Sequence, residues 1–86
     1  MAGTITVELV AADRVVWSGV ASTISARTVD GDLGILPGHA PLLSLLAPSS
    51  VEIKAVEGGD VTAEVNGGFI SVANNHVSIL AEHVTL

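Results

Sequence analysis

Cysteine is absent from this chain, which excludes a disulfide framework and thiol chemistry. Aromatic residues are nearly absent too, since Trp17 and Phe69 are the only two. Basic residues number three against nine acidic ones, which gives a formal net charge of −6. Nucleic-acid binding needs cations for the phosphates and usually aromatic rings for the bases, so the composition excludes a nucleic-acid partner. The same charge balance disfavours adhesion to anionic lipid.

Long apolar runs are also missing. A bilayer-spanning helix needs about 20 apolar residues, and the apolar stretch Leu42–Leu46 is already interrupted by Ser44. We therefore expect no direct insertion into lipid. The first residues show no basic stretch followed by an apolar run, which is the pattern of a signal peptide. Hydrophobic residues make up 49% of the 86, enough for the core of a single domain over residues 1–86.

Apolar and polar residues alternate with a period of two along most of the chain. Ile5, Val7 and Leu9 fall on one face of a segment, and the residues between them are polar. The same alternation predicts further strands at residues 14–20, 22–28, 51–55, 61–65, 69–73 and 76–80. Turn signals separate these segments at Ala11-Ala12-Asp13, Gly58-Gly59 and Asn74-Asn75. Because no segment has the spacing of an amphipathic helix, the sequence predicts an all-β sandwich or barrel.

Residues 29–43 interrupt this alternation. Three glycines and two prolines fall within these fifteen residues and restrict several backbone angles at once. The pattern predicts a rigid, shaped loop, and loops of this kind on a stable scaffold often carry function. A bend or bulge is predicted at Gly19, in the second strand.

Residues that could support catalysis or metal binding are few. His39, His76 and His83 have no spacing typical of a metal site. Asp30-Gly31-Asp32 lacks the further oxygen ligands of a calcium loop, because apolar residues fill the next positions. A hydrolase would need a nucleophile beside a positioned base, and no motif indicates one. We therefore expect no cofactor, no metal and no catalytic residue, and a binding module remains.

Trp17 allows two interpretations. A large aromatic side chain can anchor a protein interface, but it can also fill a small core. Its neighbours Val15, Val16 and Val20 favour the core.

Three segments together resemble a known family. Residues 34–43, Gly-Ile-Leu-Pro-Gly-His-Ala-Pro-Leu-Leu, are similar to the signature loop of the ATP synthase epsilon family. Trp17-Ser18-Gly19 matches the aromatic-Ser-Gly of its second strand, and residues 67–72 and 75–82 match its last strands. The similarity covers nearly the whole chain. It implies a single-domain, flattened β-sandwich of about ten short strands.

The resemblance also implies a function. Epsilon is a non-catalytic subunit of the bacterial F-type ATP synthase, on the cytoplasmic face of the inner membrane. It belongs to the central stalk, where it clamps the gamma subunit onto the ring of c subunits and helps couple proton flow to ATP synthesis. Gamma and the c ring are therefore the expected partners.

Site residues follow by matching positions within the family. Asp30, Gly31 and Asp32 correspond to the loop expected to face the c ring. The positions expected near gamma are Ala11, Ala12, Asp13, His39, Ala40, Pro41, Leu42 and Ser44. Burial in the core is an equally good explanation for Leu42 and Leu43.

The chain departs from the family pattern after Ala81-Glu82-His83. Most family members continue there into a pair of helices that can brake ATP hydrolysis and in some members bind ATP. We therefore do not carry the brake or the nucleotide site over to this sequence. A generic β-sandwich adaptor, unrelated to the rotor, is the alternative.

Overall fold

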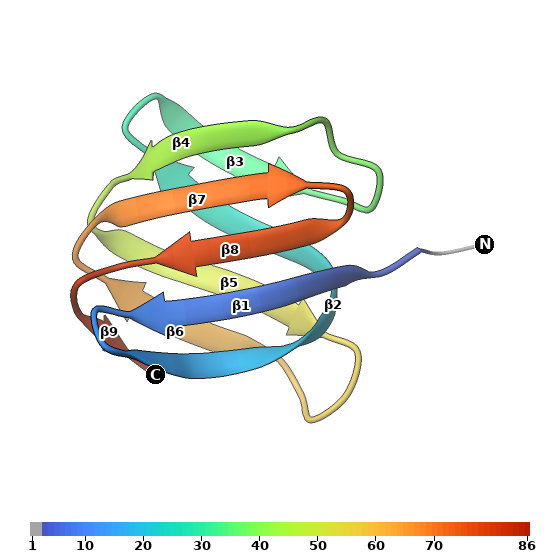
Figure 1. Ribbon diagram of the computed structural model, residues 1–86, viewed down its shortest axis with the longest axis horizontal. Helices are drawn as coiled ribbons and strands as arrows, with labels where there is room; N and C mark the ends of the chain where they lie inside the picture. The colour runs from blue at the N-terminus through green and yellow to red at the C-terminus, as the bar shows by residue number, and fades with distance from the viewer. Residues whose placement is uncertain (1–2) are drawn as a thin grey trace.

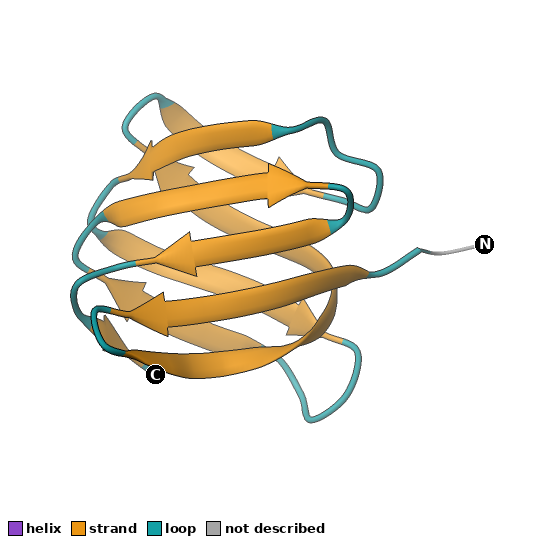
Figure 2. Ribbon diagram, in the orientation of Figure 1, coloured by secondary structure: helices purple, strands orange, loops and turns teal. Residues whose placement is uncertain are grey.

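The computed structural model describes residues 3–86, which form nine β-strands joined by turns and loops (Figure 1 and Figure 2). The predicted all-β class is confirmed, with nine strands in the described residues against about ten expected. No helix in this part of the chain is long and apolar enough to cross a membrane. The strands are β1 (Ile5–Ala11), β2 (Arg14–Thr28), β3 (Gly31–Ile35), β4 (Leu42–Leu46), β5 (Ser49–Ala55), β6 (Val61–Val65), β7 (Gly68–Ala73), β8 (His76–Leu80) and β9 (Val84–Thr85).

The strands form two layers, which lie one behind the other in Figure 1. The front layer has the order β4-β7-β8-β1 and continues into the first half of β2. The back layer consists of β3, the second half of β2, β5, β6 and β9. The molecule measures 35 × 28 × 19 Å, so the predicted flattened sandwich is confirmed.

Strand β2 belongs to both layers. Ala21 pairs with Ile5 of β1 and also with Ala55 of β5, so the corner lies at this residue. Ser22 is an extra residue in the pairing with β5, which makes a β-bulge. Inward positions are odd-numbered from Trp17 to Ala21 and even-numbered from Ile24 onward. The bulge thus keeps apolar residues inside in both layers, and the two strands predicted over 14–28 are one bent strand.

Strands β1 and β8 form the one parallel pairing among the described residues. Val7 lies opposite Val77, and Leu9 opposite Ile79, so the first strand packs against a strand about 70 residues further along. Because β1 also pairs with β2, both of its edges are hydrogen-bonded. Strand β1 therefore leaves no unpaired edge in the front layer.

The core consists almost entirely of aliphatic side chains. Its largest fully buried members are Ile5, Leu9, Ile24, Ile35, Ile53, Ile70 and Ile79. Trp17 is partly buried and packs against this cluster, in agreement with the core interpretation. Its ring lies over Gly19, where an added Cβ would be 2.8 Å from Trp17 Cζ2. The bend predicted at Gly19 is wrong, since Gly19 pairs regularly with Val7 and instead makes room for the ring.

The loop predicted over residues 29–43 is shorter than expected. Residues 31–35 form β3 and pair along β2, and β4 begins at Leu42, which leaves 36–41 irregular. Leu33 and Ile35 face inward, while Asp32 and Gly34 face outward. The glycines hid this alternation from sequence reasoning, because they are depleted in strands.

Gly68 is a strict requirement of the fold. Its φ is +119°, and an added Cβ would lie 2.0 Å from the carbonyl oxygen of Leu80. We predict that Gly68→Ala lowers the free energy of unfolding by about 3 kcal/mol or more, because backbone strain and overpacking add. Gly34→Ala is the control, since no atom lies within 4 Å of its added Cβ. Equal urea midpoints for the two variants would contradict the prediction.

Candidate functional site

The outer face of the front layer carries a continuous row of apolar side chains, of which four are exposed and one, Val10, is partly buried. In the pairing, Leu45 lies opposite Phe69, Phe69 opposite Leu80, Leu80 opposite Val10, and Val10 opposite Val15. Leu45 and Phe69 are each 48% exposed, Leu80 47% and Val15 55%. We call these five residues the apolar row. A contiguous exposed apolar surface of this kind marks an interaction site.

The row extends beyond β4 at one edge of the sheet. The backbone N–H of Val29, in the β2–β3 turn, donates to the carbonyl oxygen of Leu45 at 3.0 Å. Val29 is 61% exposed, and Leu43, two residues before Leu45 on the same face, is 71% exposed. Core burial, the alternative considered for Leu43, is therefore wrong. The apolar surface reaches from the β2–β3 turn to the start of β2.

The rest of the front face is more polar. The neighbouring cross-strand row contains Ser71, Ser78, Glu8 and Ser18 beyond Leu43. The apolar character is thus concentrated at the end of the layer where β1 and β8 finish.

A hollow of about 410 Å³ adjoins this end of the apolar row. Phe69 and Leu80 line it together with the backbone of Gly67 and Gly68. The segment after β8 is held beside it, because the backbone N–H of His83 donates to Asn66 Oδ1 at 3.1 Å. Sequence reasoning missed the row, since each of the five strands contributes only one of its members.

The residues predicted to face the c ring lie together, with Asp30 in the β2–β3 turn and Gly31 and Asp32 at the start of β3. The Thr28 hydroxyl donates to the carbonyl oxygen of Gly31 at 2.9 Å and accepts from the Asp30 backbone N–H at 3.1 Å. Asp32 accepts from Arg27 Nε at 2.9 Å, in an exposed ion pair. Within residues 3–86, no ion pair involves Asp30. Asp30 therefore carries the unpaired carboxylate of this turn.

The residues predicted to face gamma fall into two groups at opposite ends of the front layer. Strands β4, β8 and β1 run in the same direction. The loop before Leu42 therefore lies at the end where β1 begins, and Ala11 lies at the end where β1 finishes (Figure 1). The strand lengths separate the groups by about 20 Å. They do not form one cluster.

Burial further divides these residues. Ala12, Asp13, Ala40 and Pro41 are exposed, and His39 is partly buried. The side chain of Ala11 is buried, and Leu42 and Ser44 face the interior of the sandwich from β4.

The irregular loop 36–41 has a defined shape. The His39 N–H donates to the Leu36 carbonyl oxygen at 3.1 Å, and Gly38 has a φ of +86°. Together with Pro37 in the second position, this is the signature of a type II turn. His39 Nδ1 lies 2.7 Å from the Ala40 carbonyl oxygen, so the ring nitrogen donates there.

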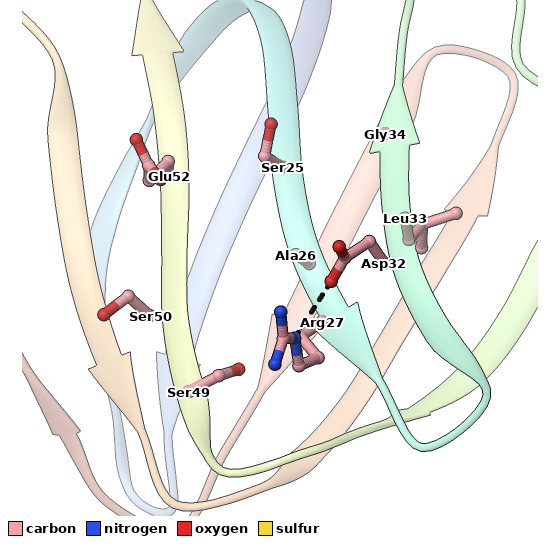
Figure 3. Close-up of a pocket in the computed structure, with 9 residues that line it drawn as sticks. All are labelled: Ser25, Ala26, Arg27, Asp32, Leu33, Gly34, Ser49, Ser50 and Glu52. Atoms are coloured by element: carbon pink, nitrogen blue, oxygen red, sulfur yellow. Dashed lines mark hydrogen bonds and ion pairs between the residues drawn. The ribbon is translucent and has the colours of Figure 1, made fainter.

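The outer face of the back layer has a different character. A hollow of about 540 Å³ lies over β3, β2 and β5, with Ser25, Arg27, Asp32 and Glu52 among its lining residues (Figure 3). Because Asp32 engages the guanidinium, Arg27 is not a free cation there. The two outer faces therefore differ, one with an apolar row and one polar.

The three histidines belong to different segments of the chain. His39 is in the loop before β4, His76 begins β8, and His83 Nε2 lies 3.8 Å from Glu82 Oε1. Among residues 3–86, no group of three or more His, Asp or Glu side chains is placed to hold a metal ion.

Comparison with known proteins gives consistent results. The family model described as the β-sandwich domain of the ATP synthase delta/epsilon chain matches residues 4–86. The ATP synthase epsilon chain of Streptomyces griseus is 56% identical over 82 residues, which are 95% of this chain and 66% of that one. The epsilon chain of Frankia casuarinae is 52% identical over 95% of this chain and 96% of its own length. The chain thus spans slightly less than two thirds of the length of the Streptomyces epsilon chains that it matches.

Solved structures agree on the fold. A chain of the Euglena gracilis mitochondrial ATP synthase, in a structure of OSCP, F1 and the c ring, superposes with a TM-score of 0.88 at 26% identity. The match covers 95% of this chain and 52% of that chain. A chain of the Tetrahymena thermophila central stalk and c ring superposes with a TM-score of 0.75 at 22% identity, over 94% and 65% respectively.

The Thr28 hydroxyl gives a direct test of how the β2–β3 turn is held. We predict that Thr28→Val lowers the free energy of unfolding by about 1–2 kcal/mol, because two hydrogen bonds are lost at a buried position. Thr62→Val is the control, since the exposed Thr62 hydroxyl makes no hydrogen bond within the described residues. Chemical denaturation measures both variants, and an equally small loss in each would contradict the assigned role of Thr28.

Proposed function

The chain belongs to the ATP synthase delta/epsilon family, and we propose that it serves as the epsilon subunit in the central stalk of a bacterial F-type ATP synthase. Its role is mechanical. It clamps the gamma subunit onto the c ring and transmits torque, so that proton flow is coupled to ATP synthesis in the catalytic head. The complex places it at the cytoplasmic face of the membrane, without insertion into lipid.

The apolar row is the observation that carries this proposal. Five aligned side chains on adjacent strands offer a preformed contact surface, and full burial of each half-exposed one gains roughly 1 kcal/mol. We assign this surface to gamma. The row begins beside the Ala12–Asp13 turn. His39, Ala40 and Pro41 lie at the other end of the front layer, where β1 begins. Ala11, Leu42 and Ser44 support this surface from its inner side.

Stiffness is the second requirement of a rotor clamp. The aliphatic core packs at a density close to that of an organic crystal. Strand β1 is paired on both edges, and β2 passes through both layers. These two features join the front and back of the sandwich covalently and by hydrogen bonds. A load applied at one face therefore reaches the other with little deformation.

The β2–β3 turn is the part we assign to the c ring. Its amide at Val29 is bonded to β4, so the turn is tied directly to the strand that carries Leu45. The unpaired Asp30 carboxylate can face polar or basic loops of the c ring. Charges of this kind chiefly set orientation and association rate. A β-sandwich adaptor unrelated to the rotor would not need the apolar row and the β2–β3 turn side by side.

The assignment of gamma to the apolar row can be tested with Leu45→Ser combined with Phe69→Ser. We expect the affinity for purified gamma to fall at least about tenfold, because central apolar contacts dominate interface energies. The double variant should stay folded and lose about 2 kcal/mol of stability, since about half of each side chain is already buried. Calorimetric titration measures the affinity.

Val56→Ser is the matched control, because Val56 is 53% exposed but lies outside the row. Equal affinity of the double variant and the control would rule out the row as the gamma surface. A wild-type chain with no affinity for gamma would overturn the proposed function.

Asp30 provides a separate test of the c-ring surface. We predict that Asp30→Lys reduces proton-driven ATP synthesis in vesicles reconstituted with the whole complex, while Asp60→Lys, with the same change of charge on another turn, does not. The difference should shrink at high ionic strength, because exposed charges are screened. Unchanged synthesis by the Asp30 variant at low salt would count against this surface.

A further inference from the structure

The hydrogen bond that closes the β-turn Leu36–His39 does not use the groups of its central peptide, which joins Pro37 to Gly38. Types I and II differ by a rotation of the central peptide, which changes φ of the third residue from about −90° to about +80°. The N–H of Gly38 belongs to this central peptide. Its direction therefore differs between the two turn types, and whatever accepts it favours one of them.

Asn75 accepts that N–H. The distance from Gly38 N to Asn75 Oδ1 is 2.6 Å, and the two residues are 37 positions apart in the chain. The bond therefore joins the loop before β4 to the turn between β7 and β8. It fixes the orientation of the central peptide of Leu36–His39 from outside the loop.

Asn75 is itself firmly held. Its φ is +59°, a conformation that asparagine tolerates better than most residues. Its carbonyl oxygen accepts from the Thr6 N–H at 2.9 Å, which ties the turn to β1. The loop is also held at Pro37, which packs near Gly3, where an added Cβ would lie 3.0 Å from Pro37 Cβ. The amide oxygen of Asn75 thus projects from a rigid turn.

We infer that Asn75 is a positioning residue, whose side chain selects the backbone conformation in which the loop presents His39, Ala40 and Pro41. The consequence for docking rests on the proposed function, because it takes gamma as the partner of this loop. A preshaped loop loses less conformational entropy on binding, which favours affinity. Asn75 needs no contact with gamma to have this effect.

Three variants separate the side chain from the turn conformation. Asn75→Gly keeps a positive φ accessible and removes the acceptor. Asn75→Asp keeps both the acceptor and tolerance of a positive φ. Asn74→Gly is the matched control, because Asn74 has a φ of +52° in the same turn and its side chain makes no hydrogen bond in the described residues.

Two measurements on each variant complete the test. Amide hydrogen exchange at Gly38, followed by NMR, reports on the bond without any partner. We expect roughly fivefold faster exchange in Asn75→Gly, from the loss of one hydrogen bond, and wild-type rates in the other two variants. Affinity for purified gamma should fall in parallel in Asn75→Gly, and Asn75→Asp should restore it.

Each outcome decides the inference. Unchanged exchange at Gly38 in Asn75→Gly overturns it, and so does faster exchange without a loss of affinity. An equal loss of affinity in Asn74→Gly overturns it as well, because the effect then belongs to the turn and not to the side chain. If the wild-type chain does not bind gamma, the proposed function fails, and the exchange data alone decide whether Asn75 sets the loop.

Discussion

The passage of β2 through both layers is the constraint on which the rest of the structure depends. A strand has a side-chain period of two, so any shift of one residue exchanges its inner and outer faces. The bulge at Ser22 introduces such a shift at the corner, where the inside of the molecule changes direction relative to the strand. Apolar residues therefore stay buried on both sides of Ala21, and a single core forms between the layers.

The pairing that builds this core also arranges the outer surface. Once Ile70, Ile79 and Leu9 are fixed inward, their neighbours in the chain must face outward and align across the strands. The apolar row is the result at one end of the front layer. On the back layer, the same rule aligns serines and charged residues around the Arg27–Asp32 pair. The two faces are therefore suited to different surroundings.

Asparagine side chains hold the irregular segments in place. Asn75 accepts the N–H of Gly38, and Asn66 accepts the N–H of His83, so each joins a turn to a segment distant in sequence. The Thr28 hydroxyl holds the β2–β3 turn through local hydrogen bonds to Asp30 and Gly31. In a small all-β domain with few charged groups, these neutral hydrogen bonds shape the loops. The strands alone determine the body of the sandwich.

The sequence by itself determined the all-β class, the family and most strand positions, because a period of two and turn residues such as Asn74-Asn75 are local signals. It did not reveal β3, whose glycines obscure the alternation, or the single bent course of β2, because a bulge depends on the partner strand. It named Ala11–Asp13 and five residues between His39 and Ser44 as facing gamma, but only the strand directions show that these two segments lie at opposite ends of the front layer. The apolar row and the Gly38–Asn75 bond were decided only by tertiary structure, since both join residues that are distant in the chain.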